Sequence, residues 1–80
     1  MPRNAVENAR GVEFDADDPA DVLRAARKAL GMSQARFAEL IETPVATLRD
    51  WEQGRYRPPG SVMVLCLIAL KNPDALLSVA

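Results

Sequence analysis

Apolar residues recur at the three- and four-residue spacing of an amphipathic helix along most of this 80-residue chain. The clearest stripe combines Val22, Leu23, Ala26 and Leu30. Residues 61–71 differ, because they are apolar on nearly every face, which is unusual for a surface helix of a small domain. We therefore predict an all-α fold without a strand, with five helices over residues 19–30, 34–42, 44–53, 61–71 and from 73 onward.

Residues that favour helix ends stand at these boundaries. Asp18 can cap the first helix with Pro19 in its first turn, and Ser33 can cap the second helix. Thr43 can cap the third helix, with Pro44 in its first turn. A glycine follows the first and the third helix, where a left-handed residue commonly ends a helix.

The N-terminal part of the chain shows no sustained periodicity. We expect residues 1–17 to form a flexible acidic segment, in which residues 11–14 can adopt a short extended piece, before a helical domain of residues 18–80. Residues 1–21 carry two basic and six acidic side chains, a net charge of −4, whereas residues 22–80 carry eight and five, a net charge of +3. The formal net charge of −1 therefore averages two unlike parts.

The composition excludes several kinds of chemistry. The chain has no histidine and one cysteine, Cys66, so a structural zinc site, a histidine general base and an intramolecular disulfide are excluded. Nothing resembles a signal peptide, and the longest apolar run, residues 61–70, is too short to span a bilayer. We expect a soluble, cytoplasmic protein that is not an enzyme and that binds no metal or cofactor.

Residues 33–54 predict two short helices joined by a tight break, which is the helix-turn-helix arrangement. Leu48 and Trp51 lie on the buried side of the second of these helices, so its opposite side would face a DNA duplex. The residues on that side are Val45, Ala46, Thr47, Arg49 and Asp50.

Two roles are open for each of these side chains. Val45 and Ala46 either contact thymine methyl groups or pack against the preceding helix. Asp50 either accepts a hydrogen bond from a cytosine amine or is a solvated charge. Arg49 can reach a guanine edge or a phosphate, and phosphate is favoured because most protein–DNA contacts go to the backbone.

The segment after the third helix is a loop that two prolines stiffen. Its arginines, Arg55 and Arg57, either bind phosphates or remain solvated. Few phosphate contacts per subunit give weak binding, so dimerisation would matter.

The apolar helix at residues 61–71 supplies a candidate dimer surface, because one helix cannot bury all of its apolar side chains against so small a domain. A dimer would place two recognition helices about 34 Å apart on a palindromic operator. The residues that we expect at the interface are Val62, Met63, Leu65, Leu67, Leu76 and Leu77.

The order Ser-Gln, Phe-Ala, Thr-Leu, Trp-Glu-Gln-Gly and an arginine-rich loop resembles the Xre/Cro-type helix-turn-helix family, and more narrowly the HigA-type antitoxins, with the helical domain of the MqsA antitoxin a near relative. The resemblance covers roughly residues 20–77. It implies a lambda-repressor-like domain in which the glutamine matching Gln34 touches the DNA, and in which Arg27 and Glu52 form an ion pair. The family usually has glycine where this chain has Glu42, so we expect a slightly different turn, since left-handed geometry there is costly.

The function implied by the resemblance is that of a dimeric, sequence-specific repressor, the antitoxin of a type II toxin–antitoxin pair. It would neutralise a RelE/HigB-like toxin and repress its own operon. The acidic N-terminal segment is either a contact for a basic toxin or a solvated tail. Two other functions remain open: a stand-alone phage- or plasmid-type regulator, and a protein-interaction adaptor that does not read DNA.

Overall fold

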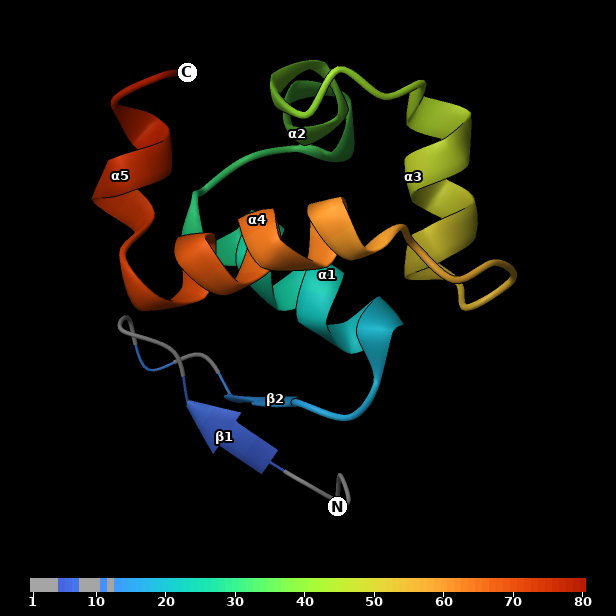
Figure 1. Ribbon diagram of the computed structural model, residues 1–80, viewed down its shortest axis with the longest axis horizontal. Helices are drawn as coiled ribbons and strands as arrows, with labels where there is room; N and C mark the ends of the chain where they lie inside the picture. The colour runs from blue at the N-terminus through green and yellow to red at the C-terminus, as the bar shows by residue number, and fades with distance from the viewer. Residues whose placement is uncertain (1–4, 8–10, 12) are drawn as a thin grey trace.

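The computed structural model describes residues 5–7, 11 and 13–80. Within them, α1 lies in the middle, α4 crosses it, and the other helices and a hairpin surround this pair (Figure 1). The five predicted helices are confirmed, and none in the described part of the chain has the length and apolar character that a membrane span requires. The elements are β1 (Ala5–Glu7), β2 (Glu13–Asp15), α1 (Pro19–Ala29), α2 (Gln34–Leu40), α3 (Val45–Glu52), α4 (Gly60–Lys71) and α5 (Pro73–Leu77).

The core forms where α1 packs against α4, α3 and β2. Its largest fully buried side chains are Leu23, Phe37, Leu48 and Cys66. Burying one such large apolar side chain contributes about 1.5–3 kcal/mol, so the predicted stripes decide which way each helix faces. Burial, and then the charge of Glu52, raise the pKa of the Cys66 thiol to about 12. This cysteine is therefore a protonated core residue at neutral pH.

Local hydrogen bonds begin the first two helices as predicted. The Asp18 carboxylate accepts a hydrogen bond from the backbone N–H of Ala20 at 3.0 Å. The Ser33 hydroxyl oxygen accepts one from the backbone N–H of Arg36 at 3.1 Å. Each cap satisfies a donor that the first turn of a helix leaves without a partner.

The predicted cap of the third helix is wrong. Pro44 occupies the N-cap position with an extended backbone, and α3 begins at Val45 without a side-chain cap. Thr43 instead donates its hydroxyl hydrogen to the carbonyl oxygen of Ile41 at 3.2 Å. The physical reason is the extended backbone of Pro44 (φ −57°, ψ 138°), which leaves the proline outside the first turn and so places Thr43 one residue before the N-cap position.

Helices α1, α2 and α3 end in the same kind of turn, with positive φ at Gly31 (68°), Glu42 (53°) and Gly54 (78°). After α2, Glu42 donates its N–H to the Glu39 carbonyl at 3.1 Å, and the next residue donates to the Ala38 carbonyl at 2.9 Å. These are the two hydrogen bonds of a Schellman motif. Our expectation of a different turn is wrong, because these bonds hold the glutamate in a geometry that costs about 1–2 kcal/mol.

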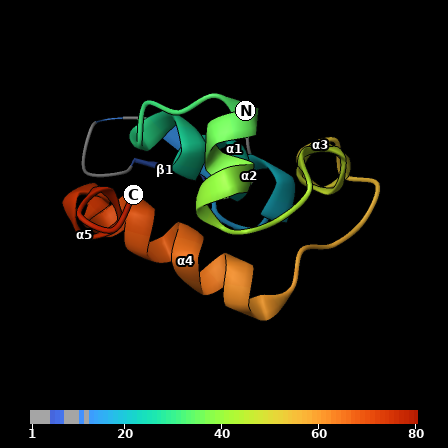
Figure 2. The same cartoon turned by 90° about the horizontal axis from the view of Figure 1, so that it is seen from above.

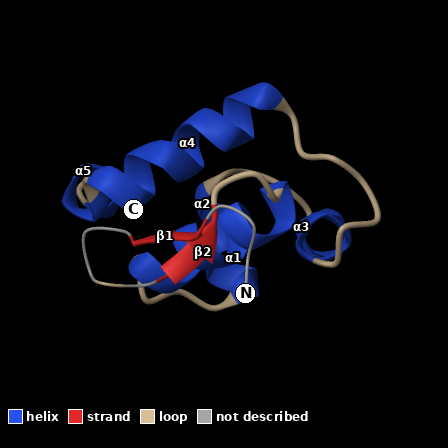
Figure 3. Ribbon diagram, turned by 90° about the horizontal axis from the view of Figure 1, so that it is seen from below, coloured by secondary structure: helices blue, strands red, loops and turns tan. Residues whose placement is uncertain are grey.

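An antiparallel hairpin precedes the helices, where we expected a flexible segment with no more than a short extended piece at residues 11–14. β1 pairs with β2 so that Val6 lies opposite Phe14, and the hairpin lies beside α1 and α4 (Figure 3). Phe14 is 7% exposed and belongs to the core, and the Asp15 N–H donates to the Asp21 carboxylate at 2.6 Å. Strands of three residues are too short to show alternation in the sequence. The other residues of the predicted flexible segment, 1–4, 8–10 and 12, lie outside the described residues.

Candidate DNA-binding surface

Helix α3 lies at one edge of the molecule, at the opposite end from α5 (Figures 1 and 2). Leu48 and Trp51 are buried beneath it, as the sequence predicted. Ala46 and Arg49 are exposed on its outward side, where Val45, Thr47 and Asp50 are half-buried. The helix is thus held by one side and offers the other to solvent.

The structure separates some of the roles that the sequence left open. Val45 packs partly against the core, whereas Ala46 is exposed. Asp50 is not a free charge, because its Oδ1 lies 3.4 Å from Nη1 of Arg55, a contact that the turn at Gly54 makes possible. Exposed ion pairs add little stability. This one can therefore open without much loss when the arginine meets another anion.

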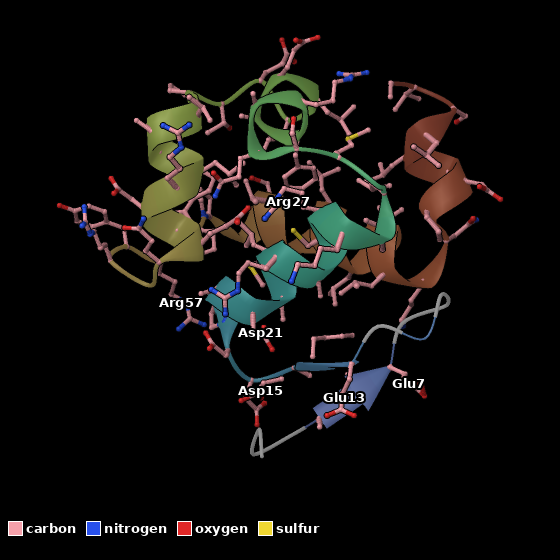
Figure 4. The ribbon with its side chains drawn as sticks, turned by 180° about the vertical axis from the view of Figure 1, so that it is seen from behind. Glu7, Glu13, Asp15, Asp21, Arg27 and Arg57 are labelled. Carbon is pink, nitrogen blue, oxygen red and sulfur yellow. The ribbon has the colours of Figure 1, made fainter. Side chains whose placement is uncertain are left out.

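The Arg27–Glu52 pair implied by the resemblance is present as a two-pronged contact. Arg27 donates from Nε to Oε2 at 3.0 Å and from Nη2 to Oε1 at 3.1 Å. Its remaining nitrogen, Nη1, donates to the Met32 carbonyl at 3.2 Å, and Arg27 extends from α1 into the interior of the helical domain (Figure 4). Glu52 is 4% exposed, so its carboxylate depends on protein donors in place of water.

Gln34, at the start of α2, lies next to this ion pair. Its Nε2 donates to Oε1 of Glu52 at 3.2 Å, and its Oε1 accepts from Nε of Arg49 at 3.3 Å. The resemblance implies that Gln34 touches DNA, and the sequence gives no sign of either of these contacts. No local pattern reveals them, because they join residues that are 18 and 15 positions apart.

A second arginine of α1 also holds the end of α3. Arg24 donates from Nη1 to the backbone carbonyl of Glu52 and from Nη2 to the Asp21 carboxylate at 3.3 Å. Cations favour the C-terminal end of a helix, where carbonyl groups lack partners. Arg24 and Arg27 are three residues apart and so share one face of α1, a spacing that could have revealed this role in the sequence.

The loop after α3 exposes Arg55, Tyr56 and Arg57. Arg57 lies beside the start of α1 (Figure 4), in a shallow pocket of about 200 Å³ that Trp51 and Asp18 also line. The loop therefore gathers two arginines and an exposed aromatic ring next to the end of α3.

The residues predicted at a dimer interface do not share one environment. Val62 and Leu76 are buried within the chain itself, which corrects our expectation that they contact a partner. The reason is the rotation of α4, which turns Val62 toward the core. Met63, Leu65 and Leu77 are half-buried and pack against the same core.

One face of α4 nevertheless remains apolar and exposed. Leu67 is 49% exposed, and it is joined by two residues outside our predicted set, Val64 at 56% and Ile68 at 39%. Their spacing of three and four residues places them on one side of the helix. We call Val64, Leu67 and Ile68 the exposed α4 face.

An apolar groove of about 530 Å³ lies between the hairpin and α4. Acidic side chains stand near it, since Glu7 and Glu13 project from the hairpin (Figure 4). The lining residues are Val6, Glu7, Phe14, Ala16, Val22, Leu67, Leu70 and Lys71.

The buried underside of α3, its exposed outward side and the tight turn before it define a helix-turn-helix unit, in which the second helix enters the major groove of DNA. Residues 23–77 match the family model described as helix-turn-helix, and the chain belongs to that family. More narrowly, it is similar to Antitoxin HigA-2 of Vibrio cholerae serotype O1, with 35% identity over 60 residues. The aligned region covers 75% of this chain and 58% of the relative. The resemblance read from the motifs is thus confirmed.

Proposed function

We propose that this protein is a dimeric, sequence-specific DNA-binding repressor and the antitoxin of a type II toxin–antitoxin pair, which represses its own operon and neutralises a RelE/HigB-like toxin. The observation that carries the proposal is the way in which α3 packs on the rest of the domain. Its inner side is buried through Leu48 and Trp51, and its last residue is held by two arginines of α1, whereas its outer side is exposed. Membership of the helix-turn-helix family supports the DNA-binding part of the proposal.

The proposed DNA contacts are Val45, Ala46, Thr47, Arg49, Asp50, Arg55 and Arg57, and Gln34 belongs to the same surface through its hydrogen bond with Arg49. The exposed arginines at positions 49, 55 and 57 supply cationic groups for phosphates, while Ala46 offers a methyl group to a thymine. Asp50 reaches a cytosine only after its pair with Arg55 opens. DNA favours the opening of this pair, because the released Arg55 can bind a phosphate while Asp50 binds the base.

DNA binding is tested by fluorescence anisotropy with a duplex that spans the region upstream of the protein's own gene. The double variant Arg49→Ala with Arg55→Ala should weaken binding, and the plot of log affinity against log salt should become shallower by about 1 for each phosphate that the variant no longer neutralises. Lys28→Ala, which removes one exposed positive charge from α1, is the control and should leave binding unchanged. Unchanged affinity and salt dependence in the double variant would exclude this surface as the DNA-binding site. Equal affinity of the wild-type protein for this duplex and for a random duplex would exclude a sequence-specific repressor.

The exposed α4 face is the proposed dimer surface, with Leu67 at its centre. Three large apolar side chains on one face are unfavourable in water and favour burial against a two-fold-related copy. Light scattering should give a dimer for the wild-type protein and a monomer for Leu67→Glu. Ala35→Glu, the same charge placed on an exposed position of α2, should stay dimeric. A dimeric Leu67→Glu protein would exclude this face.

The toxin contact is proposed at the acidic hairpin. The similarity to Antitoxin HigA-2 supports a toxin partner, and Glu7 and Glu13 give the hairpin a surface suited to a basic protein. Deleting residues 1–17 is a poor test, because it also removes Phe14 from the core. Glu7→Lys with Glu13→Lys keeps that side chain and should weaken binding of the neighbouring gene's product, measured by calorimetry. Equal affinity would exclude the hairpin, and no binding by the wild-type protein would favour a stand-alone regulator.

A further inference from the structure

Arg49 is exposed, but it is not a free side chain. Its Nε donates to Oε1 of Gln34 at 3.3 Å, and Nε2 of Gln34 donates to Oε1 of Glu52 at 3.2 Å. Glu52 is in turn fixed by the two-pronged contact with Arg27. An unbroken series of side-chain contacts therefore leads from the buried ion pair to the outward side of α3.

The chemistry of the groups fixes the direction of this series. A carboxylate only accepts hydrogen bonds, so the Gln34 NH₂ group must face Glu52. The amide oxygen then faces the opposite way, toward the Nε–H of Arg49. Reversing the amide would bring oxygen against the Glu52 carboxylate and N–H against the guanidinium, which is unfavourable at both ends.

The arrangement determines what Arg49 presents to a ligand. A guanidinium has five N–H donors in one plane, and Gln34 takes only the one on Nε. The two terminal nitrogens remain, and together they form an edge that matches two adjacent acceptor atoms. Such acceptor pairs occur on a phosphate and on the N7/O6 edge of guanine.

We infer that Gln34 is a positioning residue that orients Arg49 for its DNA contact, with the buried Glu52 as the fixed end of the unit. This inference rests on the proposed DNA binding. It differs from the direct DNA contact that we assigned to Gln34, because here Gln34 acts through Arg49. Holding the arginine in one orientation before binding reduces the conformational freedom that it loses on the duplex, and this raises affinity.

The first test is a double-mutant cycle in DNA binding, with the duplex from upstream of the protein's own gene. Gln34→Met keeps the length of the side chain and removes both hydrogen bonds. It should weaken binding about 5-fold in the wild-type background and less than about 2-fold in the Arg49→Ala background. Gln53→Met, the same change at an exposed glutamine after α3, is the control and should have little effect in either background. Equal losses in both backgrounds would show that Gln34 touches DNA independently and would overturn the inference.

The same cycle distinguishes the two acceptor sources. Removal of a phosphate interaction lowers affinity for all sequences and makes the salt dependence shallower, whereas removal of a guanine interaction relaxes discrimination at one base pair. Either result supports the inference when Gln34→Met and Arg49→Ala cause the same kind of change.

A second test needs no DNA and so separates this inference from the proposed function. In the free protein, NMR should show a slowly exchanging Arg49 Nε–H signal, and Gln34→Met should accelerate its exchange and shift it. Gln53→Met should leave the signal in place, and the backbone spectrum reports whether each variant is folded. An Arg49 signal that does not respond to Gln34→Met would overturn the inference, even for a protein that binds DNA tightly.

Discussion

Substitution of the Arg27–Glu52 pair should change the stability of the fold by an amount that depends on whether one charge or both charges are removed. Replacing Arg27 by methionine leaves the Glu52 carboxylate buried, with Gln34 as its remaining side-chain donor. Removing one partner of a buried pair typically costs about 3–5 kcal/mol. The Arg27 side chain is 18% exposed, so water reaches part of the site, and we expect the lower part of that range, about 3 kcal/mol.

The double variant Arg27→Met with Glu52→Met should behave differently. It removes both charges and retains apolar volume, and such replacements of buried ion pairs are often neutral or stabilising. It leaves Gln34 without its acceptor, which costs about 1 kcal/mol because the glutamine can still reach water. The double variant should therefore be about 2 kcal/mol more stable than Arg27→Met alone.

Urea unfolding followed by circular dichroism measures both differences. For a domain of this size, a loss of about 3 kcal/mol corresponds to a fall in Tm of roughly 12–24 °C. Arg36→Met is the control, since Arg36 contacts Glu39 at 3.4 Å in an exposed pair and its loss should matter little. A double variant no more stable than Arg27→Met would refute the reasoning, because burial of the unpaired carboxylate could not then be the main loss.

Three further predictions concern the turn, the cysteine and the hairpin. Glu42→Gly should raise stability by up to about 1 kcal/mol in urea unfolding, because relief of left-handed strain exceeds the added freedom of the unfolded chain; a loss would contradict the strain. Since folding raises the pKa of Cys66 from 9.0 to about 12, the neutral thiol favours the folded state below pH 9. That stability is lost as the pH rises from 9 to about 12. In Cys66→Ala, the free energy of unfolding should fall less steeply with pH over this range. Iodoacetamide should label the native thiol slowly at pH 8.5 and rapidly in urea. Phe14→Ala should cost about 3 kcal/mol by the same unfolding assay, whereas a loss below about 0.5 kcal/mol would mean that the hairpin is not part of the core.

The features that the sequence predicted are those decided by near neighbours. Asp18 and Ser33 bond to backbone groups two and three residues away, so their positions alone indicate helix starts. The burial of Leu48 and Trp51 follows from helical spacing. The left-handed turn at Glu42 does not follow from the sequence for a related reason, because residue type gives the steric cost but not the hydrogen bonds that offset it.

The features that the sequence missed depend on how distant segments meet. Phe14 lies in a strand too short to show alternation, and its burial appears only once β2 rests on α1. The rotation of α4, which buries Val62 and exposes Val64, cannot be read from a helix that is apolar all round. The contact between Gln34 and Arg49 likewise requires the relative placement of α2 and α3.

The hairpin also determines how the chain would respond to a cut. Phe14 lines the same groove as Val22 and Leu70, and the turn that follows it, around Asp17, is exposed. A protease that cleaved this turn would release the aromatic ring and leave those two aliphatic side chains facing water. A single cut near the N-terminus would thus add newly exposed apolar surface next to the exposed α4 face, and this would favour aggregation and degradation of the domain.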